Sequence, residues 1–163
     1  MSDPSNASDQ GSLWDFACRF YQVLGVEDDC LTVQDKHGLD VVLLIFALYR
    51  ARLGHGFDAV EAYGLARSLM AQLVDPLRRH RRALKQDPGP YALPMVKALR
   101  AQLLAAELAG EQTILQRLHS IRIKGSALNS EEALTACVRA ADVHLDAALD
   151  AVLKRLADAA HRV

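Results

Sequence analysis

Five cations crowd into the segment from Pro76 to Lys85, and this run is the chemically most distinctive part of the chain. On a helix, Arg78, Arg82 and Lys85 recur at i, i+4 and i+7 and therefore share one face, with Arg79 beside them. Cations at this spacing can contact successive phosphates, and each contact adds to an affinity that falls with salt. Arg78, Arg79, Arg82 and Lys85 are therefore the candidate anion- or nucleic-acid-binding residues.

Arg122 and Lys124 are candidates to extend this patch. The alternative is a solvated helix face that the acidic segments near the N-terminus partly neutralise. Residues 1–40 hold two cations and eight acids, whereas residues 41–128 hold thirteen cations and six acids. No aromatic residues interleave with the basic run, and no known nucleic-acid-reading motif accompanies it. We therefore treat nucleic-acid binding as the alternative interpretation.

Four aspartates, Asp28, Asp29, Asp35 and Asp40, invite a metal or acid–base hypothesis. Asp28 and Asp29 lie where a helix should begin, and a carboxylate there interacts favourably with the helix dipole. Asp40 is expected to be the N-cap of the next helix. A hard cation needs several converging oxygens, which this spacing does not ensure. We predict no metal site from these residues.

Glu107 and Glu111 lie four residues apart, as carboxylates do in the metal sites of some helical bundles. Those sites also carry Glu-x-x-His pairs, which this chain lacks. The three cysteines, Cys18, Cys30 and Cys137, and six histidines show no metal-ligand spacing. Buried, reduced cysteines are the simpler expectation. No cofactor, metal or catalytic constellation is predicted, and neither is a small-molecule ligand.

The residues that must position these groups predict an all-α protein. The composition is 51% hydrophobic and 6% aromatic, and alanine and leucine are abundant, as is typical of helices. Residues 1–11 are polar and are predicted to be a disordered tail, and no secretory leader is expected from their composition. Residues 12–163 are expected to form one cytoplasmic domain, with residues 12–90 as a compact bundle and residues 91–163 as a long helical hairpin.

The most apolar segment is predicted to be a buried helix over residues 41–53, around which the bundle packs. The run VVLLIFALY could also be a strand, but the rest of the chain offers no strand to pair with. It is too short to span a membrane. Trp14, Phe16, Phe20, Tyr21, Phe46 and Tyr49 form an aromatic set that is expected to be core.

Helices are also expected near residues 12–24, 26–37 and 58–84, with Pro76 either kinking the last of these or beginning a new helix. A long helix should run from about residue 91 to 119. The segment 130–163 repeats its apolar residues at threes and fours over more than three heptads. We therefore predict one long final helix that packs antiparallel on the helix before it.

Several stretches together resemble one protein family. They are Leu13-Trp14-Asp15-Phe16-Ala17 with Tyr21, Cys30-Leu31, Gln34-Asp35, Gly38-Leu39-Asp40-Val41, Pro76-Leu77-Arg78, Arg81-Arg82-Ala83-Leu84-Lys85, Val96-Lys97, Ala106-Glu107-Leu108 and Glu111. The chain is similar, over about residues 12–118, to an uncharacterised family of roughly 160-residue proteobacterial proteins, classed as a domain of unknown function. The resemblance implies a genuine domain and names no activity.

A non-catalytic module for protein interaction, with an adaptor or regulatory role, is the function that the sequence favours. A long hairpin would present a large amphipathic face, which suits a protein partner or a homodimer better than a nucleic acid or a membrane. The alternative is a nucleic-acid- or ribosome-associated protein that uses the basic helix 76–85.

Overall fold

The fold is all-helical in a computed structural model, which describes the backbone of residues 5–163 and the side chains of residues 13–163. This confirms the predicted fold class. The helices, in chain order, are α1 (Ser5–Tyr21), α2 (Val26–His37), α3 (Val41–Arg52), α4 (Ala59–Leu69), the π-helical turn η1 (Met70–Val74), α5 (Asp75–Gln86), α6 (Leu93–His119), α7 (Ser130–Ala140) and α8 (Ala147–Ala160). None of these helices is both long and apolar enough to cross a membrane.

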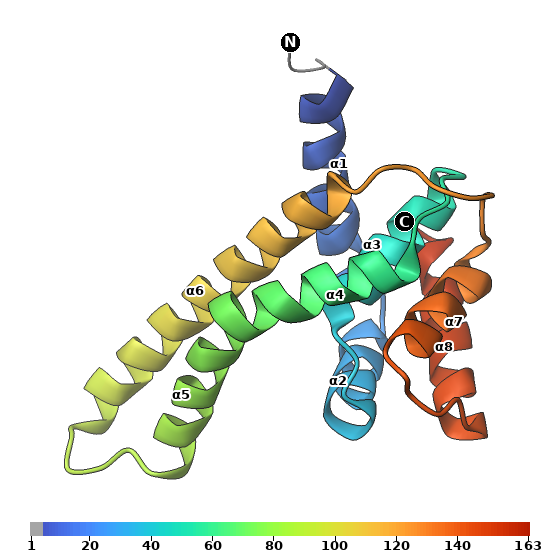
Figure 1. The fold of residues 1–163 in the computed structure, drawn as a ribbon. Helices are drawn as coiled ribbons and strands as arrows, with labels where there is room; N and C mark the ends of the chain where they lie inside the picture. The colour runs from blue at the N-terminus through green and yellow to red at the C-terminus, as the bar shows by residue number, and fades with distance from the viewer. Residues whose placement is uncertain (1–4) are drawn as a thin grey trace.

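The apolar helix α3 lies at the centre of the bundle, as predicted (Figure 1). Ten of its twelve residues are buried. Helices α1, α2, α4, α6, α7 and α8 all pack against it. A helix that is apolar on every side can be stable only when other helices cover every side. The arrangement of the remaining helices follows from this requirement.

Two charged residues at the ends of α3 are also buried. Asp40 is the N-cap residue of α3, as predicted, but its side chain makes no capping hydrogen bond. It instead accepts two hydrogen bonds from Arg67 of α4, at 2.8 and 3.0 Å. Arg50 donates to the carbonyl oxygens of His119, at 3.0 Å, and of Ile121. Its guanidinium also lies over the Phe46 ring. A buried charge needs such partners to be tolerated.

Helices α4 and α5 are continuous through the π-helical turn η1, and the chain changes direction there (Figure 1). Pro76 lies in the first turn of α5, directly after the π turn, so the helix continues past this proline with a bend. Gly110 of α6 faces the π turn, and a Cβ atom added to it would lie 2.9 Å from Cγ2 of Val74. The glycine therefore permits a close approach between α6 and η1.

The last part of the chain differs from the prediction. The long helix α6 is present, but it forms its antiparallel hairpin with α5 (Figure 1). Residues 130–163 are two helices rather than one, α7 and α8, and they pack against each other and against α3. The physical reason lies in residues 141–146, where the backbone of Asp142 adopts φ 54° and the side chain of Asp146 caps α8 by accepting from the N–H of Leu149. The apolar spacing continues across this break, and that continuity suggested a single helix.

The start of the first helix also differs from the prediction. Helix α1 begins at Ser5 rather than at Ser12, so residues 5–11 of the expected polar tail have helical backbone. Residues 1–4 lie outside the described part of the chain. Further along, Gly38 ends α2 in a left-handed conformation, and Asp58 caps α4 by accepting from the N–H groups of Val60 and Glu61. These positions agree with the helices expected near residues 26–37 and from residue 58 onward.

The close packing of Gly110 can be tested against a matched glycine. Gly110→Ala should lower the free energy of unfolding by about 1–2 kcal/mol, because overpacking costs more than the gain in helix propensity. Gly64 is also within a helix, and no atom lies within 4 Å of an added Cβ. Gly64→Ala should therefore raise the free energy of unfolding by about 0.5–1 kcal/mol. Urea denaturation measures both, and equal changes would refute the packing argument.

Candidate functional site

A two-helix arm projects from the bundle and carries the predicted basic helix (Figure 1). The arm is defined here as residues 75–113, which comprise α5, the following loop and most of α6. Only Val96 and Glu107 are buried in this segment. Six large apolar side chains of the arm are instead more than 40% exposed: Tyr91, Leu93, Met95, Leu99, Leu104 and Leu108.

Charged side chains hold the two helices of the arm together. Arg81 donates two hydrogen bonds to Glu107, at 2.5 and 3.0 Å. Arg78 donates to Glu111 at 2.8 Å and lies 3.8 Å from Glu107. The side chains of Glu107 and Arg78 are only 4% and 14% exposed. Burial raises the pKa of Glu111, while the nearby guanidinium of Arg78 acts in the opposite direction.

The predicted basic patch is therefore divided. Arg78 is turned into the arm by its glutamate partners. Arg82 reaches across to Asp35 of α2 at 3.3 Å, and both side chains are more than half exposed. Arg79 and Lys85 are exposed, and within the described residues neither has an ion pair. The acidic N-terminal segment thus neutralises one of the four predicted residues, and a glutamate on α6 neutralises another.

A groove separates the arm from α1 and α2. Its volume is about 410 Å³. The bundle side is formed by Tyr21, Glu27, Cys30, Leu31, Gln34 and Val41, and the arm side by Arg78, Arg81, Arg82, Leu104, Glu107, Leu108 and Glu111. The groove is therefore lined by exposed apolar side chains and by three arginines of α5.

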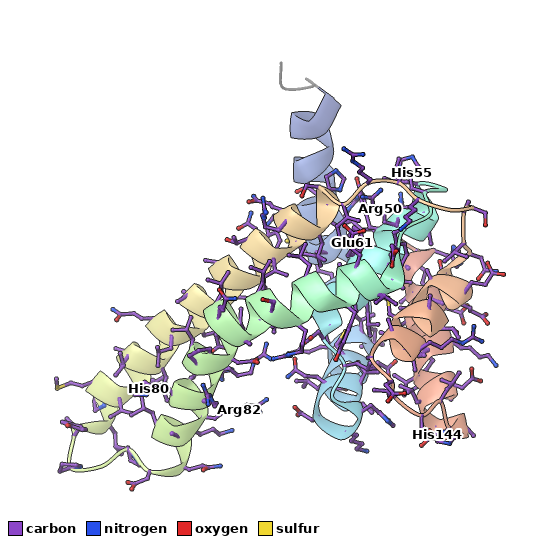
Figure 2. The ribbon with its side chains drawn as sticks, in the orientation of Figure 1. Arg50, His55, Glu61, His80, Arg82 and His144 are labelled. Carbon is purple, nitrogen blue, oxygen red and sulfur yellow. The ribbon has the colours of Figure 1, made fainter. Side chains whose placement is uncertain are left out.

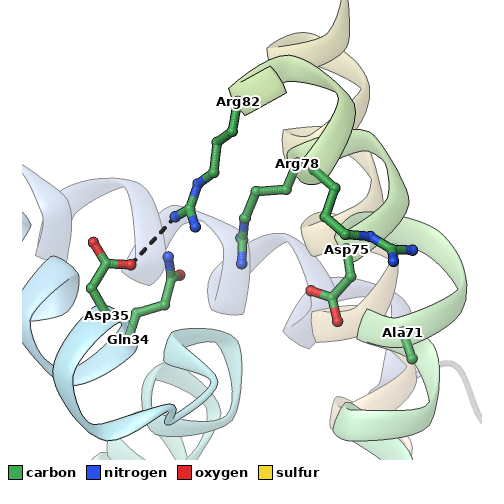
Figure 3. Close-up of a pocket in the computed structure, with 7 residues that line it drawn as sticks. Gln34, Asp35, Ala71, Asp75, Arg78 and Arg82 are labelled. Carbon is green, nitrogen blue, oxygen red and sulfur yellow. Dashed lines mark hydrogen bonds and ion pairs between the residues drawn. The ribbon is translucent and has the colours of Figure 1, made fainter. Parts of the chain in front are cut away.

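A second hollow of about 440 Å³ adjoins the groove and shares Gln34, Arg78 and Arg82 with it. Figure 3 shows the guanidinium groups of Arg78 and Arg82 extending from α5 toward the side chains of Gln34 and Asp35 on α2. Asp75 and Arg79 also line this hollow. Arg78, Arg82 and Gln34 thus lie between the two hollows.

The other predicted cations lie elsewhere. Arg122 and Lys124 line a different hollow together with Glu61 and Leu65 of α4, and Lys124 pairs with Asp58 at 2.8 Å. They therefore do not extend the surface formed by α5.

Three of the four aspartates that invited a metal hypothesis pair with different arginines, and the fourth, Asp28, lines a separate hollow. Asp29 pairs with Arg155 of α8 at 2.6 Å, Asp35 with Arg82, and Asp40 with Arg67. Burial raises the pKa of Asp40, and Arg67 opposes this shift. Within the described side chains, no three His, Cys, Asp or Glu residues are grouped as metal ligands would be. Figure 2 shows His55, His80 and His144 in separate parts of the molecule.

Two of the three cysteines are buried, and Cys18 is exposed, which the sequence did not anticipate. Cys30 lines the groove, where a hydrogen bond links its thiol to the Tyr21 hydroxyl. Burial raises the pKa of Cys30 to about 12 and that of Cys137 to about 12. Because the thiolate is the reactive form, neither residue is poised as a nucleophile at neutral pH.

Sequence reasoning missed Arg81 as a structural partner and missed the exposed apolar surface of the arm. Arg81 is the one arginine of the run that was left out of the candidate residues. Its position, four residues after Leu77 and three before Leu84, places it on the apolar side of the helix, and this was the available signal. Glu107 and Glu111 pair with Arg81 and Arg78, and the sequence reasoning did not identify these arginine partners.

Comparison with known proteins identifies one family. The model of a family described as "Protein of unknown function (DUF2390)" matches residues 12–118. No curated protein and no solved structure matches the chain. Several of the stretches on which the resemblance rests meet at the groove: Tyr21, Cys30-Leu31, Gln34, Arg78, Arg81-Arg82, Glu107-Leu108 and Glu111.

The buried charges of the arm predict a strongly non-additive pair of mutations. Arg81→Met should lower the free energy of unfolding by about 2–3 kcal/mol, because it leaves Glu107 buried with only a distant partner. Adding Glu107→Leu to that variant should restore stability to within about 1 kcal/mol of the wild type, since both charges are then absent. A double-mutant cycle by urea denaturation measures the coupling. Additive effects would show that the pair does not hold the arm.

The three thiols should differ in reactivity. In the native protein at pH 8, one thiol per chain should react rapidly with Ellman's reagent, and Cys18→Ser should abolish that fast phase. All three thiols should react in guanidinium chloride, because unfolding exposes Cys30 and Cys137. Fast reaction of two or more thiols in the native protein would contradict the burial of the groove cysteine.

Proposed function

The chain belongs to the DUF2390 family, whose model covers residues 12–118, and we propose that it is a non-catalytic protein-interaction module whose docking surface is the arm. The observation that carries the proposal is how little of the arm is buried. Only two of its residues are buried, whereas six of its large apolar side chains are exposed. A helical hairpin is stabilised mainly by the apolar face that it buries. Large apolar side chains left in water often mark a site that another protein covers.

The exposed apolar side chains of the arm lie in two places that a partner could contact, the groove and the tip. Leu104 and Leu108 lie one turn apart on α6 and face the groove, with Leu31 on the opposite wall. Tyr91, Leu93 and Met95 lie at the tip of the arm, each at least 65% exposed. The charged pairs keep α5 and α6 together without consuming these side chains. The proposal also places the protein in the bacterial cytoplasm. The three cysteines of the chain are free thiols, which is consistent with a reducing compartment.

The alternative is nucleic-acid binding by the same helix. Arg79, Arg82 and Lys85 remain available for phosphates, but Arg78 and Arg81 are held by glutamates. The two proposals differ in their salt dependence. Binding of RNA or DNA through this helix would weaken steeply as salt rises, and Arg82→Glu with Arg79→Glu would abolish it. An apolar docking surface would tolerate moderate salt better.

Photo-cross-linking in the protein's own host cells tests the interaction. A photoreactive amino acid at Met95 or Leu108 should cross-link to another protein, because these exposed side chains lie on the proposed surface. The matched control is Val60, which is 70% exposed, like Met95 at 69%, but lies on α4 outside the arm. Cross-links at the arm that exceed those at Val60 by about tenfold would support the proposal. Equal or absent cross-linking would reject the arm as a docking surface.

A further inference from the structure

Helix α6 presents an uncharged surface to water along the arm. Of its charged residues between positions 98 and 113, Glu107 is buried, and Arg100 and Glu111 are half-buried. A surface helix usually has the reverse arrangement, with its charged residues outside and its apolar residues against the core. The exposed residues of this stretch, called here the α6 face, are Ala98, Leu99, Ala101, Gln102, Leu104, Ala105, Ala106, Leu108, Ala109 and Thr113.

Helix α7 has the usual arrangement in the same molecule. Its exposed residues are Glu131, Glu132 and Arg139, and its apolar side chains pack in the core. Helix α6 differs because its two glutamates are held inward by the arginines of α5. What remains outside is apolar, with Leu99, Leu104 and Leu108 at 42%, 45% and 49% exposed. Within the described residues, the chain therefore leaves the α6 face uncovered.

We propose that a second copy of this chain covers the α6 face, with the two α6 helices packed antiparallel about a twofold axis near Ala105, an inference that rests on the proposed function. An uncharged face of leucines and alanines is complementary to itself, because neither copy brings a charge that would be buried without a partner. The alanines also let the two helix axes approach to about 8 Å, the short end of the usual range.

Charged residues at one edge of the α6 face select the antiparallel orientation. Lys97 and Glu111 lie on the same edge, because about four helical turns separate them. A twofold axis midway between them passes near Leu104, so Lys97 of each copy lies opposite Glu111 of the other. Lys97 is exposed and has no ion pair within the described residues. The Glu111 carboxylate can accept from this lysine in addition to Arg78. A parallel pair would instead bring Lys97 beside Lys97.

The extent of the α6 face suits a dimer of this kind. Residues 93–113 span about 30 Å of helix. Figure 1 shows this part of α6 projecting from the bundle beside α5. In an antiparallel pair, Leu93 and Met95 at each tip lie beside the base of the other arm, which lengthens the contact. The total buried surface is then on the order of 1,000 Å², near the lower limit for a specific interface. We therefore expect a dimer that dissociates on dilution.

Matched glutamate substitutions test which surface forms the dimer. At high concentration, sedimentation equilibrium should give the wild-type chain about twice the 17.9 kDa mass of one copy. Ala105→Glu places two carboxylates near the axis, one from each copy, and should raise the dissociation constant by about tenfold or more. Ala151→Glu is the control, because Ala151 is also an exposed helical alanine but lies on α8. It should leave the dissociation constant within about twofold of the wild type.

Engineered cysteines test the orientation. In a Cys18→Ser background, exposed Met95 and Thr113 are each changed to cysteine in separate chains. The Met95→Cys and Thr113→Cys chains should form a disulfide when mixed under mild oxidation, because a twofold axis near Leu104 brings these two positions together. Each variant alone should form far less, since its own cysteines lie at opposite ends of the pair. Lys97→Glu should raise the dissociation constant by about threefold or more, because it sets an acid against Glu111 of the other copy. Circular dichroism confirms that each variant is folded.

Failure of this dimer is distinguishable from failure of the proposed function. A chain that stays monomeric, or a dimer that Ala105→Glu and Ala151→Glu leave equally stable, would overturn the inference. Disulfides formed by each cysteine variant alone would also overturn it, because they indicate a parallel pair. If photo-cross-links from Met95 then reach a different protein, the arm remains a docking surface and the proposed function stands. If the chain is monomeric and neither Met95 nor Leu108 cross-links to protein, both proposals fail.

Discussion

Burial of α3 on all sides is the constraint on which the rest of the structure depends. Ten of its twelve residues are inaccessible to water, so helices from both halves of the chain must cover it. The two charged groups at its ends then need partners in the core. Asp40 accepts hydrogen bonds from Arg67 of α4, and Arg50 donates to carbonyl oxygens at the end of α6. These contacts fix where α4 and α6 leave the bundle, and therefore where the arm begins.

The arm is held together by a different kind of contact from the bundle. Its inner surface is held by Arg78 and Arg81 against Glu107 and Glu111, and few apolar side chains are buried there. Ion pairs of this kind add little net stability, because desolvation offsets the attraction, but they are costly to break singly. They favour one register of α5 on α6. The apolar side chains of the arm are left outside, available to another protein.

The groove follows from these two rules together. Helix α2 is held to the bundle by α3 and by the pair of Asp29 with Arg155 of α8, whereas α5 is held by α6. Neither set of contacts closes the space between α2 and α5. The side chains around that space, Arg82 on one wall and Leu31 on the other, therefore keep contact with water.

The sequence by itself determined the helical class, the central position of α3, the end of α2 near residue 37 and the start of α4 near residue 58. These features depend on local propensity, capping and periodicity. Residues that are close together in the sequence determine all three. Only the tertiary structure decided that α6 pairs with α5, that residues 130–163 divide at Asp142, and that Arg78 and Arg81 point inward while Arg79 and Arg82 do not. Pairing depends on which faces meet across long sequence separations, and the apolar spacing of the final segment was equally compatible with one helix or with two.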